Sequence, residues 1–258
     1  MIIMTKMHGV KIEDLKLISN NIIKLLLVVI LSISCNSNKN NMIKEKNNRL
    51  FIEKFTDLPL HENSYILYDN NSKECYIIDP GSLPDKIINF VEKNSLKVKA
   101  VLNTHGHFDH TFYNDYLANH FNVKVLLDSR EGANLERGIK NFHHIYKYSI
   151  LSKVPKNKFD ITKPLYIGKH RIDIFETPGH TEGSLSFVIK DIKTIFTGDT
   201  LFKGTIGRTD LPGGSFDEIK KSILKLFIFP NDYIIYSGHG ENSTIGYEKK
   251  YNYILKFL

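Results

Sequence analysis

Three histidines and one aspartate lie within a stretch of six residues, at positions 105–110. They follow the apolar run Ala100-Val101-Leu102, which predicts a buried strand. Imidazole nitrogens and carboxylate oxygens are ligands that zinc, iron and manganese take in proteins. A cluster of these groups at the end of a strand therefore indicates a metal site, with four candidate ligands: His105, His107, Asp109 and His110.

Three more candidate ligands, His180, Asp199 and His239, each follow a glycine just beyond a predicted strand. Glycine lets the backbone turn sharply and approach an ion closely. With the first cluster they make five histidines and two carboxylates. That is too many ligands for one tetrahedral ion, and it suits two ions that share a carboxylate.

The elements that must position these ligands can be predicted from hydrophobic periodicity. Strands are expected at 50–55, 64–68, 74–78, 100–103, 123–127, 165–167, 170–176, 185–189, 194–196 and 233–236. Helices are expected at 84–93, 109–121, 216–229 and 244–257, with a short helix capped by Ser129 and an irregular segment at 138–163. Locally paired strands flanked by helices in two comparable halves predict an α/β (α+β) fold. We expect a four-layer αββα sandwich of two mixed β-sheets with helices on the outer faces.

The N-terminal 48 residues are predicted to be a leader or linker, separate from a catalytic domain at 49–258. The uncharged run 25–34 is too short to span a membrane and is typical of a secretory signal. Ser34-Cys35 before a polar stretch resembles a bacterial lipoprotein processing site, in which Cys35 would be acylated. The alternative is translation that begins at Met42. We accordingly expect a cytoplasmic protein or, alternatively, one anchored to a membrane by lipid on Cys35.

Composition argues against a nucleic-acid partner and against a cysteine-based site. The net charge of +7 comes mainly from scattered lysines, and the arginines that would read nucleic acid form no cluster. Cys35 and Cys75 are the only cysteines, so there is no disulfide framework and no cysteine zinc site.

Taken together, the motifs resemble those of the metallo-β-lactamase superfamily. They are His-x-His-x-Asp-His at 105–110, Pro-Gly-His-Thr at 178–181, Gly-Asp-Thr at 198–200 and Gly-His-Gly at 238–240, together with 63–65 and 78–81. The resemblance implies that His105, His107 and His180 hold a first ion. It implies a second ion on Asp109, His110 and His239, with Asp199 bridging the two.

Within the superfamily, 199–215 and 239–248 look like the single-domain glyoxalase II-like branch. This resemblance implies a hydroxyacylglutathione hydrolase-like enzyme that cleaves a small-molecule thioester with a metal-bound hydroxide. It implies two divalent ions, zinc first and iron or manganese as alternatives, with Asp109 orienting the nucleophile. Full-length glyoxalase II holds glutathione in an additional C-terminal helical region. Only residues 240–258 follow His239 here, which leaves the thiol carrier open.

Substrate contacts are expected from the aromatic and basic middle segment and from the loop after Asp199. The candidates are His143, His144, Lys147 and Arg208.

The alternative function is a persulfide dioxygenase that uses one iron and fewer of the metal ligands. Gly238-His239-Gly240 favours the hydrolase, and the loop at 204–215 argues against a β-lactamase.

Overall fold

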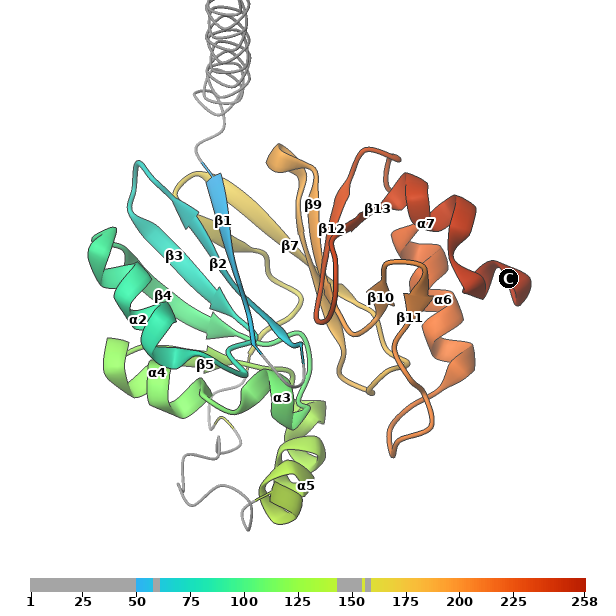
Figure 1. Ribbon diagram of the computed structural model, residues 1–258, viewed down its shortest axis with the longest axis horizontal. Helices are drawn as coiled ribbons and strands as arrows, with labels where there is room; N and C mark the ends of the chain where they lie inside the picture. Colours follow the sequence, from blue (N-terminus) through green and yellow to red (C-terminus); the bar gives the residue numbers. More distant parts are fainter. Residues whose placement is uncertain (1–49, 58–60, 143–154, 156–158) are drawn as a thin grey trace, which may run out of the picture. The chain divides into compact units, whose positions relative to one another are not determined.

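Two mixed β-sheets carry the fold, and helices lie on their outer faces (Figure 1). The computed structural model describes residues 50–57, 61–142, 155 and 159–258, with backbone only at 139–142. The predicted leader, Cys35, and the predicted substrate contacts His143, His144 and Lys147 lie outside the described residues. The four-layer sandwich predicted from the sequence is confirmed.

The first sheet has five strands. They are β1 (Leu50–Thr56), β2 (Asn63–Asp69), β3 (Glu74–Ile78), β4 (Lys97–Leu102) and β5 (Lys124–Leu126). The pairs β1–β2 and β2–β3 are antiparallel, and β3–β4 and β4–β5 are parallel. The antiparallel strands β2 and β3 form a hairpin.

The second sheet has six strands in the order β13-β12-β9-β8-β7-β6. They are β6 (Leu165–Ile167), β7 (His170–Glu176), β8 (Leu185–Ile189), β9 (Thr194–Gly198), β12 (Ile234–Ser237) and β13 (Ser243–Thr244). The pair β9–β12 is parallel, and the others are antiparallel. A separate two-stranded ribbon pairs β10 (Leu201–Phe202) with β11 (Thr205–Ile206).

Alternating side chains of the strands fill the space between the sheets and the layers outside them. Along β2, Tyr65 and Leu67 join the cluster between the sheets, whereas Ile66 joins the cluster under the outer helices. From the second sheet, Phe187 and Phe196 complete the inner cluster. This alternation is what the period-two pattern of the sequence predicts.

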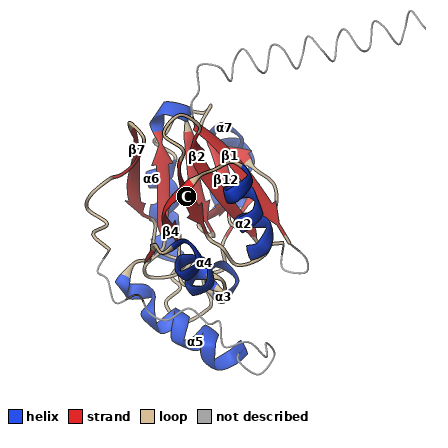
Figure 2. Cartoon of the chain, turned by 90° about the vertical axis from the view of Figure 1, so that its left-hand side faces the viewer, coloured by secondary structure: helices blue, strands red, loops and turns tan. Residues whose placement is uncertain are grey.

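Helices cover the outer face of each sheet, as Figures 1 and 2 show. On the first sheet lie α2 (Pro84–Lys93) and α4 (Asn114–Phe121), which bury Ile87 and Leu117. On the second lie α6 (Phe216–Leu226) and α7 (Ile245–Tyr251). Helix α2 matches its predicted bounds, with Pro at its start and an acidic first turn, both of which favour helix initiation.

The single helix predicted at 109–121 is wrong, because the chain forms α3 (Phe108–Thr111) and then α4. Between them, Tyr113 leaves helical geometry and donates its N–H to the carbonyl of Pro80 at 3.0 Å. Next to it, Asn114 donates from Nδ2 to Oδ1 of Asn103 at 2.7 Å. Both hydrogen bonds join this junction to other parts of the chain, and hydrophobic periodicity does not predict such contacts.

The C-terminal helix predicted at 244–257 is also interrupted. Helix α7 ends at Tyr251, and the 3₁₀ helix η3 (Tyr253–Lys256) follows an extended Asn252. Asn252 accepts the N–H of Ile254 at 3.0 Å and donates to the carbonyl of Thr205 at 3.0 Å. The side chain of Asn252 thus stops one helix and starts the next.

Smaller differences concern caps and short elements. The 3₁₀ helix η1 (Ser129–Glu131) is capped by Asp128 rather than by Ser129, and it continues into α5 (Gly132–Phe142). Helix α6 ends at Leu226, before the predicted Phe229. The strands β10, β11 and β13 and the 3₁₀ helix η2 (Lys190–Ile192) were not predicted. Within the described ranges, no helix has the length and apolar character needed to cross a membrane.

Candidate metal centre

The loops that carry the candidate ligands meet because the strands before them point the same way. In the second sheet, β7 and β9 are both antiparallel to β8, and β12 is parallel to β9. The carboxyl ends of these three strands therefore share one edge of the sheet. There the N–H of Gly238 donates to the carbonyl of Gly198 at 2.9 Å, which joins the Asp199 loop to the His239 loop.

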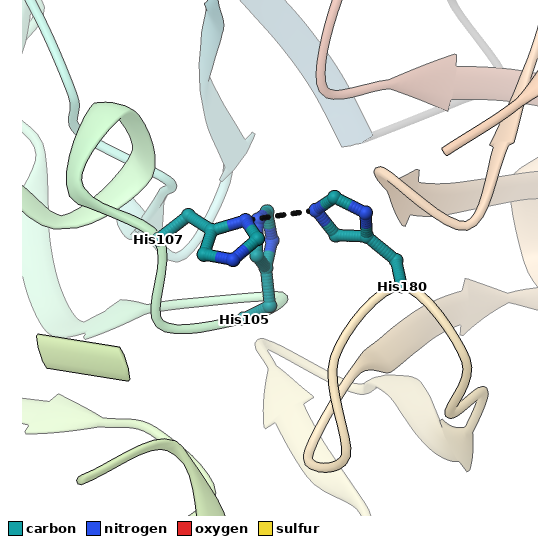
Figure 3. A group of neighbouring side chains, drawn as sticks. All are labelled: His105, His107 and His180. Atoms are coloured by element: carbon teal, nitrogen blue, oxygen red, sulfur yellow. Dashed lines mark hydrogen bonds between the residues drawn. The ribbon is translucent and has the colours of Figure 1, made fainter. Parts of the chain in front are cut away.

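A first group of ligands consists of His105, His107 and His180, whose candidate ligand atoms all lie within 4.8 Å of one another (Figure 3). Nδ1 of His107 and Nε2 of His180 are 2.8 Å apart. Nδ1 of His180 bonds the carbonyl of Arg208 at 2.8 Å, and Nδ1 of His105 lies 3.1 Å from Oγ1 of Thr104. The bonds at Nδ1 of His180 and of His105 orient these two rings so that their Nε2 atoms remain for an ion, and His107 faces the same point with Nδ1.

A buried nitrogen supports the assignment of a metal to this group. His105 is 1% exposed, and its Nε2 atom has no hydrogen-bond partner among the described residues. Buried polar atoms in native proteins are nearly always satisfied, by protein, water or an ion. The donor set of imidazoles and carboxylates fits divalent zinc, iron or manganese.

A second group consists of Asp109, His110 and His239. Nε2 of His239 lies 3.3 Å from Oδ2 of Asp109 and 3.3 Å from Nε2 of His110. On its other side, the His110 ring places Nδ1 3.2 Å from Oδ2 of Asp79. A carboxylate behind a histidine is the usual arrangement that fixes the orientation of a ligand ring.

Asp199 lies between the two groups. Its Oδ2 atom is 3.5 Å from Nε2 of His180 and 3.6 Å from Nε2 of His239. Its Oδ1 atom is 3.3 Å from Nε2 of His110. One carboxylate thus faces ligands of both groups, which is the position that a bridging ligand requires.

The start of α3 directs the candidate ligands at 105–110 into different groups. His107 is the N-cap residue and keeps an extended backbone, with φ −68° and ψ 150°. The next residues turn into the helix, and the N–H of His110 reaches the carbonyl of His107 at 3.1 Å. Because of this turn, His107 joins the first group whereas Asp109 and His110 join the second.

Burial and repulsion by neighbouring histidines keep His105 and His107 uncharged. Burial lowers the pKa of His105 well below its ordinary value, and the neighbouring His110 and His107 lower it further. Burial and His180 lower the pKa of His107 to about 4. At neutral pH these imidazoles are therefore neutral, which is the form that binds a metal.

The second group is ionic when it holds no cation. Burial opposes the charge of His110, yet Asp199 and Asp109 raise its pKa well above the ordinary value. Burial likewise opposes the charge of His239, and Asp109 raises its pKa. The pKa of Asp109 is held low, against its burial, mainly by His110. A divalent cation would replace these protons and neutralise the same carboxylates.

Two buried carboxylates beside the site, Asp79 and Glu131, were not among the predicted site residues. Asp79 follows β3 with φ +49° and accepts the backbone N–H and Oγ1–H of Thr104 at 2.7 and 2.6 Å. The sequence signal for it was the Asp-Pro-Gly turn directly after a strand. Glu131 is fully buried beside both histidine loops of the first group, and no motif marks it.

Arg208, predicted to contact substrate, is exposed near the site. Its side chain pairs with Asp210, with Nε–Oδ1 at 2.8 Å and Nη2–Oδ2 at 2.6 Å, while its carbonyl orients His180. Contact between its side chain and a substrate remains a prediction.

Comparison with known proteins agrees with this geometry. The chain matches the model of the metallo-β-lactamase superfamily over residues 58–239. The probable metallo-hydrolase M6_Spy0554 of Streptococcus pyogenes is 34% identical, over 74% of this chain and 84% of its own. Hydroxyacylglutathione hydrolase GloC of Haemophilus influenzae is also 34% identical, over 74% of this chain and 91% of its own.

Solved structures share the architecture. The BLEG-1 B3 metallo-β-lactamase is 33% identical with a TM-score of 0.72, covering 80% of this chain and 99% of its own. TTHA1623, solved in a di-iron-bound form, is 28% identical with a TM-score of 0.69, covering 80% of this chain and all 100% of its own. By fold, ligand geometry and sequence, this chain belongs to the metallo-β-lactamase superfamily and is a metal-dependent hydrolase.

Proposed function

We propose that the protein is a thioester hydrolase of glyoxalase II type that holds two divalent cations. The observation that carries the proposal is Asp199, which faces both His180 and His239. The first cation would be held by His105, His107 and His180. The second would be held by Asp109, His110 and His239, with Asp199 shared between them.

Cations bound there would lower the pKa of a water molecule and polarise the carbonyl of the substrate. The side chains of Asp109 and His239 are 27% and 26% exposed, whereas that of His110 is fully buried. Water and substrate therefore approach from the side of Asp109. Its carboxylate would orient the water molecule for attack and accept a proton from it. The leaving thiolate is a stable anion, so its departure needs no strong general acid.

Two features support a thioester over other substrates of the superfamily. The loop at 204–215 resembles that of glyoxalase II-like enzymes, and the relative GloC is a hydroxyacylglutathione hydrolase. The assembled second group also favours two ions over the single iron of a persulfide dioxygenase.

A β-lactam hydrolase is a second candidate, because the 33% identical BLEG-1 is a β-lactamase. Both reactions need a carbonyl polarised beside an oriented water molecule, so the metal centre alone does not separate them. The glyoxalase-type loop makes the thioester the first choice.

The test combines metal analysis with three assays on full-length protein purified without added metal. We expect two metal ions per chain, hydrolysis of hydroxyacyl thioesters, and little turnover of a chromogenic cephalosporin. Oxygen uptake with a persulfide and one iron per chain would instead identify the dioxygenase. Cephalosporin turnover faster than thioester turnover would favour the second candidate.

A further inference from the structure

Glu131 is a fully buried carboxylate that accepts four hydrogen bonds. Its Oε2 atom accepts the N–H of Gly106 at 2.8 Å and Nδ2–H of Asn134 at 2.7 Å. Its Oε1 atom accepts the N–H of Gly183 at 2.8 Å and Oγ1–H of Thr181 at 2.7 Å. Each oxygen is thus satisfied by one backbone amide and one side chain.

These partners belong to the two loops that carry the first group of ligands. Gly106 lies between His105 and His107, in the loop after β4 of the first sheet. Thr181 follows His180, in the loop after β7 of the second sheet. One side chain, from a third element, therefore joins the ligand loops of both sheets.

The two glycines leave room for this carboxylate. A Cβ atom on Gly106 would lie 2.7 Å from Oε2 of Glu131, and a Cβ atom on Gly183 would lie 2.7 Å from Oε1. At Cβ contacts under 3.0 Å the carboxylate would have to shift, so each loop keeps its present distance from Glu131 because it has no side chain there. The loops and Glu131 form one packed unit whose spacing is set by four charge-assisted bonds.

The second group of ligands has a different support. Its loop around His239 is held by Asn63, whose N–H donates to the carbonyl of Gly238 at 2.8 Å. Nδ2 of Asn63 also donates to the carbonyl of Gly240 at 3.1 Å. Loss of Glu131 should therefore disturb one ion more than the other.

We propose that Glu131 is a positioning residue that sets the spacing of His105 and His107 against His180, and thereby the affinity for the first ion. The inference rests on the proposed two-ion centre. Glu131 itself does not bind the ion. It acts through the loops, in the way that outer-shell partners of metal ligands raise metal affinity about 10- to 100-fold.

The experiment measures Zn²⁺ affinity at each half of the centre by competition with a chromophoric chelator. A full-length Asp109→Ala/His239→Ala variant retains the first group, and a His107→Ala/His180→Ala variant retains the second. Glu131→Gln is added to each, because an amide offers one acceptor oxygen where four donors converge. We expect Kd to rise at least about tenfold in the first background and less than about threefold in the second.

Glu248→Gln is the matched control. Glu248 is also fully buried, and it accepts the N–H of Gly204 at 2.9 Å and Nδ2–H of Asn252 at 2.6 Å. Neither partner has a hydrogen bond to a proposed ligand in the bonds described. This variant should lose stability as Glu131→Gln does, yet bind Zn²⁺ as its parent does.

Thr181→Val keeps the test decisive if Glu131→Gln does not fold, because it removes one of the four donors and preserves the shape. It should raise Kd for Zn²⁺ at the first group, by a smaller factor than Glu131→Gln does. If Kd for Zn²⁺ rose equally in both backgrounds, or in neither, the proposed role of Glu131 would be wrong and the proposed function would be unaffected. A wild-type chain that binds no metal would refute the proposed function as well, so the two failures are distinguishable.

Discussion

Two histidines of the first group, His105 and His180, are held by hydrogen bonds on the side of the ring opposite the proposed ion. Arg208 contributes only a carbonyl to His180, and Thr104 a hydroxyl to His105. In the second group, Asp79 supports His110. The orientation of these three rings is thus set by residues that need not touch the ion.

His107→Ala tests the ligand assignment. We expect it to remove one ion per chain and to lower thioester turnover by at least about 100-fold, more than loss of an outer-shell partner does. Elemental analysis and the thioester assay give the two readings. His120→Ala is the control, because His120 is exposed on α4 and pairs only with Glu92 in the bonds described. Full metal content in the His107 variant would show that the assignment is wrong.

Gly238→Ala tests the close approach of the backbone to the ligands. Its Cβ atom would lie 2.1 Å from Oδ1 of Asp199 and 2.6 Å from Cε1 of His110. We expect loss of bound metal and a decrease of about 1–3 kcal/mol in the free energy of unfolding, typical of overpacking. Gly204→Ala is the control for metal content, because nothing lies within 4 Å of its added atom. Its φ of +76° strains the backbone of an alanine, so it should lose stability without losing metal. Retention of both ions by the Gly238 variant would contradict the geometry.

The reactivity of the Cys75 thiol tests whether this side chain is buried within the first sheet. Burial raises the pKa of this thiol to about 12, so at pH 8 it stays protonated as well as covered. In a Cys35→Ser variant, we expect no reaction with a disulfide reagent until urea unfolds the chain. The reaction is followed by absorbance, and modification of the folded protein at the rate of a free thiol would disprove the burial.

The candidate ligands could be predicted from the sequence, because histidines and aspartates near glycines at the ends of predicted strands form a recognisable pattern. The roles of Asp79 and Glu131 could not. Glu131 meets Gly106 across 25 residues and Gly183 across 52, and neither spacing has a periodic signature. The contacts of Glu131 join loops of both sheets, so they exist only after the sheets have packed.

At the scale of elements, α6 and its N-cap residue hold the loop before His180 by two hydrogen bonds. The N–H of Ser215 donates to the carbonyl of Gly179 at 2.8 Å, and Oγ–H of Ser222 donates to the carbonyl of Pro178 at 2.7 Å. The start of this helix thus fixes both its own first turn and the loop before His180.

Ser215→Ala tests that start. The Ser215 hydroxyl accepts the N–H of Glu218, and its loss should lower the free energy of unfolding by about 1 kcal/mol. Urea denaturation followed by circular dichroism measures the change. Leu224→Ala, at a position 53% exposed on the same helix, should change stability much less. An equal loss in both variants would argue against a capping role.

Element types were predicted well and their interruptions poorly. Periodicity reports which face of a helix is buried, and it located α2 and α6. It does not report Tyr113 or Asn252, where hydrogen bonds to distant segments outcompete the next helical turn. Long-range contacts therefore account for both broken helices.

At the scale of the whole molecule, the layers were predictable because each buried face repeats with a fixed period. The pairing order of the strands was not, since it depends on which distant segments meet. The parallel pair β9–β12, for example, brings Asp199 beside His239 across 40 residues of chain, from 199 to 239.

Phe187→Ala tests the packing between the sheets. Phe187 is fully buried in the inner cluster, so its truncation should lower the free energy of unfolding by about 3–5 kcal/mol. Ile228→Ala, at a position 71% exposed, is the control and should have little effect. Denaturant titration of both variants measures the change. A decrease under about 1 kcal/mol in the free energy of unfolding of the Phe187 variant would contradict a close-packed interior.

The division of ligands between the sheets also sets an order of events during folding. His105, His107, Asp109 and His110 follow β4, whereas the remaining three ligands follow strands of the other sheet. Neither ion's set is complete until both halves have associated, so metal would enter a chain that is already folded rather than nucleate its folding. Once bound, each ion would cross-link the halves and slow their separation, so that metal loading would protect the finished protein against unfolding.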